Sequence, residues 1–579
     1  MSAPLATSLL ETRRGQMFPR FGREQIEVIR RFAGPVQRFA PGQLLVKVGE
    51  RGSPSCLVLA GSIVVNWRDG LGGTGNITTH SVGQFTGEIG ALSGRPSMAE
   101  LTAGPEGCEV APLDAAALRA VVVGNAEIGE IVMRALILRR VGLIQTGAGG
   151  PILLGRAGSR DLVRLQSFLS SNGIPNTTLD PDTDHDAEIL IDRFRVAPEQ
   201  LPLAVCPGGQ VLRNPIEAEL AQCLGLVPEL RLDRPYDVAI VGAGPAGLAT
   251  AVYAASEGLS VIVLDSRAFG GQAGASARIE NYLGFPTGIS GQALAGRAFT
   301  QAQKFGAEIA IPVEVLRLQC GGVKERSDDL PPPDCRQPSF SLCLTGSNKR
   351  VAARAVVIAS GARYRRPEID KLQEFEGRGI YYWASPVEAR LCGSQEVILV
   401  GGGNSAGQAA VFLSGHTARV HLLVRRRGLE ETMSRYLIDR IAGLGNVELH
   451  PETEIVRLTG NGAGLECVHW KNRRTSVVER REIRYVFLFA GAVPNARWLD
   501  DTGVTLDAKG FVKTGIQLRQ DELDAAGWNS RAPAPLPLET SRAGVFAIGD
   551  VRAGSVKRVA SAVGEGAAVV AQLHQFLTN

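Results

Sequence analysis

Two short apolar runs in the second half of the chain each lead directly into a glycine-rich turn. Residues 238–241 read VAIV and are followed by GAGPAG at 242–247, while residues 397–400 read VILV and are followed by GGGNSA at 401–406. An alanine-rich, helix-forming stretch follows each turn, and this pattern is typical of the βα unit of a parallel sheet. One such turn is weak evidence, but two in one chain predict two dinucleotide-binding domains.

The pattern is different in the first part of the chain, where apolar runs are short and closely spaced. Turn residues at Pro41-Gly42, Gly49 and Gly61 separate these runs. Short strands at such spacing predict a small antiparallel β-barrel, followed by an amphipathic helix. The predicted elements are a helix at 23–32, strands at 44–46, 56–59 and 62–65, and one long helix at 114–144.

The barrel region also contains the sequence FTGEIGAL at 85–92. Together with the preceding glycine turns, it resembles the cyclic-nucleotide-binding domain family, in which a glutamate binds the ribose and an arginine nine residues later binds the cyclic phosphate. Glu88 matches the glutamate, whereas Ser97 stands at the arginine position and Arg95 lies two residues before it. The resemblance implies Glu88 as a candidate ligand-binding residue. Because a phosphate needs a cationic partner, we expect a docking or regulatory module that need not bind a cyclic nucleotide.

A smaller unit is predicted between residues 148 and 230. Its element order resembles the thioredoxin-like fold, and Pro202 stands where that fold places a cis-proline. The turn after its first strand, GRAGSR at 155–160, contains no cysteine, so we expect a scaffold without redox activity. The predicted strands are 151–154 and 203–206, and the predicted helices are 161–170, 187–194 and 217–226.

Composition narrows the class of protein. The 579 residues include 62 Lys and Arg against 58 Asp and Glu, and this dispersed net charge of +4 is unlike that of a nucleic-acid-binding protein. The nine cysteines include no C-x-x-C pair, and residues 1–20 contain no secretory signal, so we expect reduced thiols in a cytoplasmic protein. Charged residues interrupt the apolar stretch 115–144, which predicts an amphipathic helix rather than a membrane span.

The acidic segment DPDTDHD at 180–186 has the composition of a calcium loop but not its pattern. Position six would be His185 instead of glycine, and position twelve would be Ile191 instead of glutamate. We therefore interpret the segment as an acidic loop before a helix, and we expect no metal site in this protein.

The first glycine turn has the features of a site for FAD or NAD. The first glycine permits a tight turn, the second lets backbone amides approach a pyrophosphate, and the third lets the helix pack closely on the sheet. Asp265 ends the next predicted strand, where a carboxylate accepts hydrogen bonds from ribose hydroxyls and repels a 2′-phosphate. The candidate residues are Gly242, Gly244, Pro245, Ala246, Gly247 and Asp265.

Four later segments distinguish between these two dinucleotides. They read FGGQ at 269–272, IENY at 279–282, VFAIGD at 545–550 and KRVASAVGEG at 557–566. In this order they resemble the flavin-binding segments of the low-molecular-weight thioredoxin reductases, which implies FAD at the first turn. The resemblance also implies that a cationic helix N-terminus stabilises the reduced flavin. The residues it assigns to FAD are Gln272, Asn281, Gly549, Asp550 and Val559, with Lys557 and Arg558 beside the flavin.

The second turn, at 401–406, is followed by a basic segment instead of an acidic one. The strand predicted at 418–424 ends in three arginines at 425–427. Guanidinium groups suit a 2′-phosphate, so the pattern favours NADPH over NADH. Glu430 and Glu431 are close enough in sequence to neutralise part of this charge. The candidate NADPH residues are Gly401, Gly403, Asn404, Ser405, Ala406, Arg425 and Arg426.

The segment before the second turn lacks the cysteines that thioredoxin reductases use. In that family a C-x-x-C pair just before the nicotinamide strand takes electrons from the flavin, whereas residues 377–387 here read GRGIYYWASPV. The two possible alignments place the pair at Trp383 and Pro386 or at Ala384 and Val387. Neither alignment finds a thiol, so we expect no internal disulfide that relays electrons and no catalytic side chain of this kind.

Cys392 is the sulfur nearest to this segment. A lone cysteine is more often a small buried hydrophobic residue than a redox group. Tyr382 and Trp383 could instead cover the flavin. That arrangement would fit direct electron transfer from the flavin to an outside acceptor, as in the ferredoxin reductase relatives of the same fold.

The chain as a whole predicts an α/β oxidoreductase with two Rossmann-like domains, preceded by an antiparallel β-barrel with helices and a thioredoxin-like domain. We expect hydride transfer from NADPH to FAD and then direct electron transfer to an external redox protein or small molecule. A thioredoxin-disulfide reductase in the strict sense and a redox- or cyclic-nucleotide-responsive signalling protein are the alternatives. Resemblance alone implies a homodimer. The predicted domains are 1–147 (cyclic-nucleotide-binding-like), 148–230 (thioredoxin-like), 231–381 (FAD), 382–491 (NADPH, inserted) and 492–579 (FAD).

Overall fold

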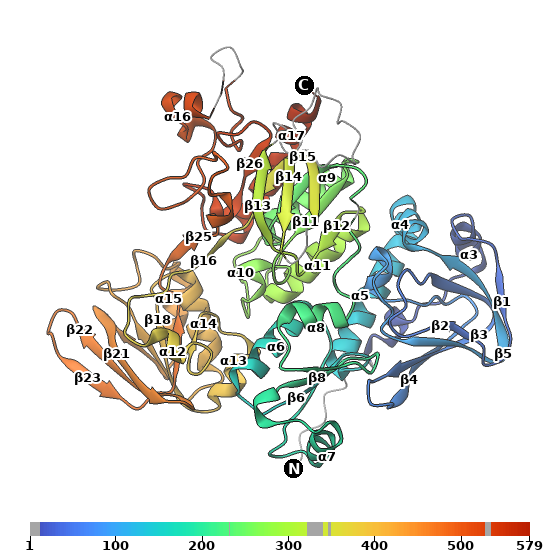
Figure 1. Ribbon diagram of the computed structural model, residues 1–579, viewed down its shortest axis with the longest axis horizontal. Helices are drawn as coiled ribbons and strands as arrows, with labels where there is room; N and C mark the ends of the chain where they lie inside the picture. Colours follow the sequence, from blue (N-terminus) through green and yellow to red (C-terminus); the bar gives the residue numbers. More distant parts are fainter. Residues whose placement is uncertain are drawn as a thin grey trace. The chain divides into compact units, whose positions relative to one another are not determined.

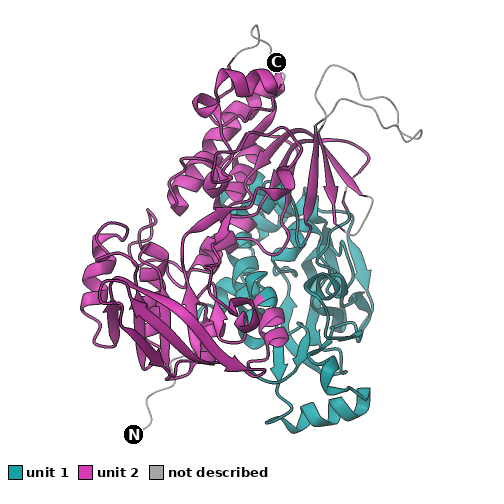
Figure 2. Cartoon of the chain, turned by 60° about the vertical axis from the view of Figure 1, so that its left-hand side comes forward, with its two compact units in different colours: residues 1–157, 168–229, 300–312 teal, residues 158–167, 230–299, 313–579 magenta. Residues whose placement is uncertain are grey.

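The computed structural model describes residues 12–230, 232–320, 340–345, 349–526, 528 and 534–578, without the side chain of Cys320. The chain divides into two compact units (Figure 2). The first contains residues 1–157, 168–229 and 300–312, and the second contains residues 158–167, 230–299 and 313–579. Part of the segment searched for a secretory signal, the thiol of Cys335 and the predicted domain start at residue 231 lie outside the described residues.

The N-terminal sheet is antiparallel, and one of its strands was predicted as two. The runs at 56–59 and 62–65 belong to a single strand, β3 (Ser55–Arg68), so that prediction is wrong. The register of β3 against β5 shifts on either side of Ala60-Gly61, and the strand continues through the expected turn as a bulge. The strand order is β1-β5-β3-β4, with β2 on β5 (Figure 1). The other strands are β1 (Gln37–Phe39), β2 (Leu44–Val46), β4 (Thr74–Ser81) and β5 (Glu100–Leu113).

The helix predicted at 114–144 is in fact two helices, α4 (Ala115–Gly124) and α5 (Ala126–Thr146). Asn125 between them has φ −136° and ψ 108°, outside the helical region, and its side chain accepts the N–H of Ile128 at 2.9 Å. Asn125 therefore caps the second helix instead of continuing the first. The other helices of this region are α2 (Arg14–Met17), α3 (Arg23–Arg30) and the 3-10 helix η1 (Ile89–Ser93).

A smaller four-stranded sheet follows in the order β7-β6-β8-β9, in which only β6 and β7 are parallel. The Leu201–Pro202 peptide bond is cis, as predicted. A disulfide joins Cys206 to Cys223, whose Cα atoms lie 6.5 Å apart, so the expectation of reduced thiols is wrong for this pair. No sequence motif marks the pair, because only the fold brings it together. The elements are β6 (Ile152–Leu154), α6 (Arg160–Ser171), β7 (Thr177–Leu179), α7 (His185–Phe194), η2 (Pro198–Gln200), β8 (Leu203–Val205), β9 (Val211–Arg213) and α8 (Glu217–Cys223).

The first glycine turn lies at the end of a central strand of the mixed sheet in the second unit. The strands are β10 (Tyr236–Val241), β11 (Val261–Leu264), β13 (Val315–Cys320), β14 (Phe340–Leu344), β15 (Arg350–Ile358) and β26 (Val545–Ala547). Their order is β11-β10-β15-β14-β13, with β26 on β15 (Figure 1). The strands around β10 are parallel and buried, as the apolar runs predict. The chain leaves this sheet after β15 and returns to it at β26.

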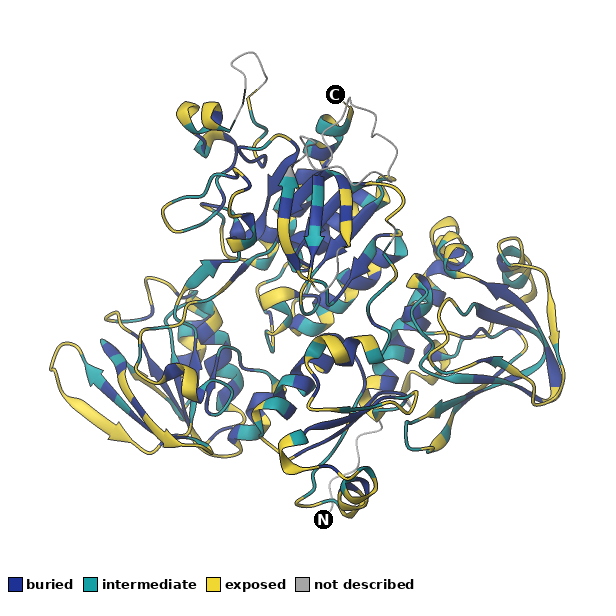
Figure 3. Cartoon of the chain, in the orientation of Figure 1, coloured by how far each residue is buried: buried dark blue, intermediate teal, exposed yellow. Residues whose placement is uncertain are grey.

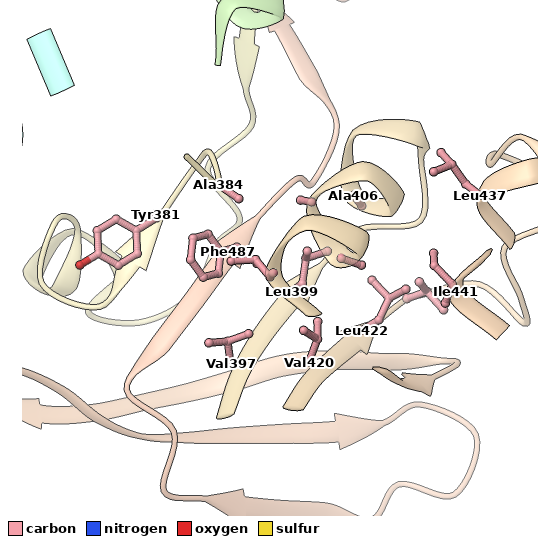
Figure 4. Close-up of a cluster of buried hydrophobic side chains, with 14 of the residues drawn as sticks. Tyr381, Ala384, Val397, Leu399, Ala406, Val420, Leu422, Leu437, Ile441 and Phe487 are labelled. Atoms are coloured by element: carbon pink, nitrogen blue, oxygen red, sulfur yellow. The ribbon is translucent and has the colours of Figure 1, made fainter. Parts of the chain in front are cut away.

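The second glycine turn lies in a separate parallel sheet with the order β17-β24-β18-β19-β20. Side chains of β18 and β19 pack against those of α14 and α15 in one buried cluster (Figure 4). The sheet includes β17, so it begins before the predicted domain start at residue 382. The elements are β17 (Ile380–Tyr381), α13 (Pro386–Cys392), β18 (Glu396–Val400), α14 (Asn404–Ser414), β19 (Arg419–Leu423), α15 (Arg435–Ala442), β20 (Val447–His450) and β24 (Tyr485–Leu488).

Two short antiparallel strands, β16 (Ala362–Tyr364) and β25 (Ala492–Pro494), carry the chain from one of these sheets to the other and back. The three strands β21–β23 form a small sheet of their own. The remaining elements are α9 (Pro245–Ser256), α10 (Gly271–Gly274), α11 (Gly291–Lys304), β12 (Glu308–Ala310), α12 (Leu372–Phe375), β21 (Thr453–Asn461), β22 (Gly464–Asn472), β23 (Val478–Arg481), η3 (Arg497–Leu499), η4 (Gly515–Gln517), α16 (Gln520–Ala525), η5 (Gly549–Val551) and α17 (Val559–Thr578).

Burial follows the sheets, whose central strands are buried while loops and outer helix faces are exposed (Figure 3). None of the helices in the described part of the chain combines the length and the apolar character needed to span a bilayer.

Candidate functional site

The turn after β10 is so tight that its first residue must be glycine. Gly242 has φ +114°, and its N–H donates to the carbonyl oxygen of Leu264 at 2.8 Å. A Cβ at this position would lie 2.2 Å from the carbonyl oxygen of Ala359. Any side chain here would therefore push the turn away from the sheet.

Beyond Gly242 the chain opens into the N-terminus of α9. Gly244 is the N-cap and Pro245 the first helical residue, and no described side chain caps this end of the helix. A Cβ at Gly244 would come no closer than 4.0 Å to another described atom, so the space beside it is open. Ala246 and Gly247 are buried where the helix meets the sheet. Uncapped N–H groups beside an open space fit a pyrophosphate.

Asp265 is partly buried, and both carboxylate oxygens accept backbone N–H groups. Its Oδ2 accepts from Ala243 at 2.9 Å, and its Oδ1 accepts from Arg267 and Ala268 at 2.9 and 3.2 Å. Burial raises the pKa of this carboxyl, and the three hydrogen bonds oppose that shift. The predicted ribose acceptor thus also holds the glycine turn in place.

Two of the predicted flavin segments lie against this turn. A Cβ at Gly549 would be 2.9 Å from that of Ala246, and one at Gly271 would be 3.2 Å from the Cα of Gly244. The side-chain amide of Gln272 donates a hydrogen bond to the carbonyl oxygen of Ala362, the first residue of β16. The geometry therefore brings the turn, the 269–272 segment and the 545–550 segment together.

Glu565 organises the C-terminal flavin segment, although it was not singled out from the sequence. Its Oε2 accepts a hydrogen bond from the N–H of Gly549 at 2.6 Å, and its Oε1 accepts one from the guanidinium of Arg552. This carboxylate therefore fixes the loop before α17. Its position in the glycine-containing run at 557–566 was the available signal.

Asp550 and Lys557 form the polar part of this segment. Burial raises the pKa of Asp550, and the positive charge of Lys557 opposes the shift. The Lys557 ammonium donates to the carbonyl oxygen of Asp550 at 2.6 Å, so it already has a protein partner. Val559 is the first residue of α17. Asn281 is exposed on its loop, and among the described residues its side chain makes no hydrogen bond to the turn.

The second turn repeats the geometry of the first. Gly401 has φ +145°, its N–H donates to the carbonyl oxygen of Leu423 at 3.0 Å, and a Cβ would lie 2.8 Å from the carbonyl oxygen of Phe489. Gly403 is the N-cap of α14, and no described atom lies within 4 Å of where its Cβ would be. Ala406 is buried against the sheet (Figure 4). This open helix N-terminus also fits a pyrophosphate.

One side chain predicted at the second turn already has a protein partner. The Oδ1 of Asn404 accepts the N–H of Ser434 at 2.7 Å. Burial raises the pKa of Tyr364 of β16, and the Ser405 hydroxyl opposes that shift. The contact of Asn404 with Ser434 is tertiary, so the sequence does not reveal it.

The three arginines after β19 differ in their partners. All three are exposed. Arg426 forms an ion pair with Glu431, the residue that the sequence marked as a possible neutralising group. The Nε of Arg427 lies 4.0 Å from Glu452, whereas Arg425 forms no ion pair with a carboxylate of the described residues. The charge of Arg425 is therefore the least neutralised of the three.

Comparison with known proteins identifies the family to which a chain with these two turns belongs. The sequence profile of the pyridine nucleotide-disulphide oxidoreductase family matches residues 236–566, more than half of the chain. The chain belongs to this family. It is 30% identical over 334 residues to the thioredoxin reductase of Mycoplasmopsis pulmonis, covering 57% of this chain and 94% of that protein.

Solved structures agree with this assignment to the pyridine nucleotide-disulphide oxidoreductases. T. acidophilum thioredoxin reductase matches with a TM-score of 0.50 and 28% identity, over 60% of this chain and 100% of that one. Lactococcus lactis thioredoxin reductase in its FR conformation matches with a TM-score of 0.50 and 25% identity, over 59% and 99%. The chain is thus a flavin-dependent NAD(P)H oxidoreductase, thioredoxin reductase-like over 236–566, and its family implies FAD and NADPH, which the two open turns fit.

The segment before β18 departs from a disulphide-containing oxidoreductase. The Trp383 indole N–H donates to Glu388 Oε1 at 2.9 Å, and Glu388 Oε2 accepts the N–H of Ser385 at 3.0 Å. Glu388 is fully buried, and the sequence analysis missed it, although Ser385 and Glu388 have the spacing of a capping box. The guanidinium of Arg267 lies 5.1 Å from the centroid of the Trp383 ring.

The remaining groups of this segment are also occupied or inert. The Tyr382 hydroxyl donates to Glu376 Oε1 at 2.6 Å, so this ring and that of Trp383 both have protein partners. Cys392, at the end of α13, is fully buried, and burial raises its thiol pKa to about 12. A thiol with that pKa is protonated at neutral pH and is a poor nucleophile.

Proposed function

We propose that this protein oxidises NADPH through FAD and delivers the electrons directly to an acceptor outside its own 236–566 region, a redox protein or a small molecule. One observation carries the proposal: residues 377–396 hold a single cysteine, Cys392, which is buried and protonated. A dithiol relay needs two thiols that can form a disulfide. When bound, FAD itself accepts a hydride and can release electrons to an acceptor.

Backbone groups and a few side chains would hold the FAD. The N-terminus of α9 binds the pyrophosphate, and Asp265 binds the ribose with the lone pairs that its three backbone N–H donors leave open. Glu565 keeps the loop before α17 in shape, and Lys557 supplies a positive charge nearby. The proposed FAD residues are Gly242, Gly244, Pro245, Ala246, Gly247, Asp265, Gln272, Asn281, Gly549, Asp550 and Val559.

The N-terminus of α14 would bind the NADPH pyrophosphate, and the arginines after β19 would bind the 2′-phosphate. Arg425 makes the larger contribution, because Arg426 must share its charge with Glu431. The proposed NADPH residues are Gly401, Gly403, Asn404, Ser405, Ala406, Arg425 and Arg426. In this assignment the Asn404 side-chain oxygen positions the turn through the N–H of Ser434.

We place the flexible connection between the FAD and NADPH domains at the paired strands β16 and β25. Contacts between the domains include an ion pair between Arg440 and Glu280 and the stacking of Arg267 on Trp383. Both involve exposed or partly exposed groups and are weak enough to break in a domain rotation. The proposed domains keep the boundaries 1–147, 148–230, 231–381, 382–491 and 492–579, except that β17 (Ile380–Tyr381) belongs to the NADPH sheet.

Two alternatives follow from specific features. Relatives named thioredoxin reductase favour a disulfide substrate, and the disulfide between Cys206 and Cys223 is a pair that such chemistry could reduce. Glu88, in the barrel that resembles cyclic-nucleotide-binding domains, favours a ligand-responsive role. We regard both as secondary to direct electron transfer, and we expect a cytoplasmic homodimer, which sedimentation velocity tests.

Anaerobic reduction followed by an acceptor screen tests the proposal. NADPH is added to the purified holoprotein until the flavin absorbance bleaches, and ferredoxin, flavodoxin, a quinone or oxidised thioredoxin is then added separately. The proposal expects rapid reoxidation by at least one acceptor that contains no disulfide. Reoxidation by thioredoxin alone would contradict it, as would a flavin that NADPH does not bleach.

A further inference from the structure

The five-stranded N-terminal sheet and the helices beside it line a cavity of about 380 Å³, called the barrel cavity below, that the flavin chemistry does not use. Its wall is formed by residues of α2, β2, β3, β4, β5, η1 and α5 and of the loops between them, in the blue to cyan part of the chain in Figure 1. Most of the lining is apolar and includes aromatic, aliphatic and methionine side chains, among them Phe18, Val65, Trp67, Met98 and Leu101. A concave, mainly apolar space of this size is typical of a small-molecule site.

Three polar side chains of this wall have buried atoms without a hydrogen-bond partner in the described structure. These atoms are Ser55 Oγ, His80 Nδ1 and Arg139 Nη2, and the three residues are only 1%, 2% and 6% exposed. A buried polar atom without a partner is costly, and a folded protein usually provides one. A bound ligand would supply the missing acceptor.

The three groups gather at one end of the cavity. Arg139 Nη1 donates to the carbonyl oxygen of Gly87 at 2.8 Å, and a Cβ on Gly87 would lie 2.5 Å from Ser55 Oγ. The Phe18 ring lies 5.7 Å from that of His80, and the Arg139 guanidinium lies 5.4 Å from the Phe18 centroid. The Ser55 hydroxyl, the Arg139 guanidinium and the His80 imidazole therefore lie close to Gly87 and Phe18.

The charged residues that line the cavity are Arg14, Arg95, Arg139 and Glu88, so the net charge of its lining is positive. No ion pair joins Arg139 to a carboxylate among the described residues, and burial lowers the pKa of its guanidinium to about 9. Arg95 also lines the cavity, and burial lowers its pKa to about 10. A buried guanidinium is strongly stabilised by an anion that it can pair with.

The polar side chains at the positions expected to bind a cyclic nucleotide, Glu88 and Ser97, already form hydrogen bonds within the protein. Glu88 Oε1 accepts the N–H of Gly90 at 2.8 Å, and its Oε2 lies 3.4 Å from Arg140. The Ser97 hydroxyl donates to the carbonyl oxygen of Ala99 at 2.7 Å. A ribose and a cyclic phosphate would therefore find few open partners here, whereas a single anionic head on an apolar body would fit.

We propose that the barrel cavity binds a monoanionic ligand with a hydrophobic body, of the carboxylate class, whose head group meets Arg139, Ser55 and His80. The apolar lining takes the body, and the three unpartnered groups take the two carboxylate oxygens. The site lies entirely within residues 14–148, so it is separate from the flavin and NADPH turns.

Displacement of a fluorescent probe tests the proposal on the full-length holoprotein. Anilinonaphthalene sulfonate, itself an apolar anion, is bound first, and decanoate, decanol or cyclic AMP is then titrated in. We expect decanoate to displace the probe at least about tenfold more effectively than decanol, because only decanoate carries the charge. Equal displacement by decanol, stronger displacement by cyclic AMP, or no displacement by decanoate would overturn the proposal.

Variants locate the site. Arg139→Met should weaken decanoate binding by about tenfold or more, whereas Arg38→Met, an exposed arginine of the same barrel, should bind as the native protein does. If Arg139→Met fails to fold, Ser55→Ala decides, because removing an unpartnered buried hydroxyl leaves the fold intact. Ser55→Ala should bind decanoate several-fold more weakly at unchanged or higher thermal stability. Native affinity in Ser55→Ala and Arg139→Met would refute the site.

Discussion

Replacing Arg425 by alanine should convert this oxidoreductase from NADPH preference toward NADH. Arg425 is exposed two residues after β19, the strand that follows the glycine turn at 401–406, and in dinucleotide-binding folds this position selects between a ribose hydroxyl and a 2′-phosphate. Arg426 beside it is already paired with Glu431, so it must break that ion pair to serve a phosphate. Arg425 has no such competition among the described ion pairs, and its loss should dominate.

The size of the effect follows from these partners. A hydrogen bond to a charged group contributes about 1.5–3 kcal/mol, which corresponds to a loss of about tenfold to about a hundredfold in kcat/KM for NADPH. For Arg426→Ala we expect less than about tenfold, because an exposed ion pair contributes only about 0–1 kcal/mol and its release offsets part of the lost contact. The kcat/KM for NADH should change little in either variant, since NADH lacks the 2′-phosphate.

Stopped-flow flavin reduction by NADPH and by NADH, measured for each variant under anaerobic conditions, provides the assay. Arg427→Ala is the matched control, because it removes the same charge from the same exposed segment near Glu452. The reasoning is refuted if Arg425→Ala and Arg427→Ala lose equal activity with NADPH, or if NADH activity falls in parallel with NADPH activity.

Three further predictions concern the turn, the barrel and the disulfide. Gly242→Ala should abolish stoichiometric FAD binding, because its Cβ would lie 2.2 Å from a carbonyl oxygen; a flavin-to-protein ratio near that of the native protein after purification would contradict this. Burial lowers the pKa of His80 to about 3, so the folded state favours neutral His80 and loses stability as pH falls below about 6.5, by about 1.4 kcal/mol per pH unit. His80→Gln should remove that slope from the pH dependence of urea unfolding of the N-terminal unit between about pH 6.5 and 4.5, and an unchanged slope would count against it. Replacing Cys206 and Cys223 together by serine should lower the free energy of unfolding by about 3 kcal/mol, because the two cysteines are 17 residues apart in the sequence, while the rate of flavin reduction by NADPH stays unchanged. A lower rate of flavin reduction would instead assign the pair a redox role.

Local rules predicted the elements that carry the two dinucleotide turns. The apolar runs before Gly242 and Gly401 became buried parallel strands, because an uninterrupted β-branched run fits a sheet covered on both faces. The positive φ values of the two glycines follow from the same turn geometry. These features depend on a few consecutive residues, and the sequence contains all of them.

Features that depend on distant residues escaped prediction. Asn125 divides a helix that periodicity alone continues, because its side chain competes for the next helix's N–H groups. The Cys206–Cys223 bond, the Glu565 contact with Gly549 and the engagement of Asn404 by Ser434 each join segments that only the folded chain brings together. The absence of the two cysteines near Trp383 is evident in the sequence, but the hydrogen bonds of the buried Glu388 carboxylate with Trp383 and Ser385 could not be predicted from it.

The stoichiometry of reduction tests the central claim, that electrons leave the flavin without an internal dithiol relay. The holoprotein is titrated anaerobically with NADPH while flavin absorbance and free thiols are both followed. We expect one equivalent of NADPH per FAD to complete the bleaching and the number of free thiols to stay the same. A second equivalent consumed together with two new thiols, lost again in the Cys206→Ser, Cys223→Ser variant, would contradict it and identify an internal disulfide as the electron acceptor.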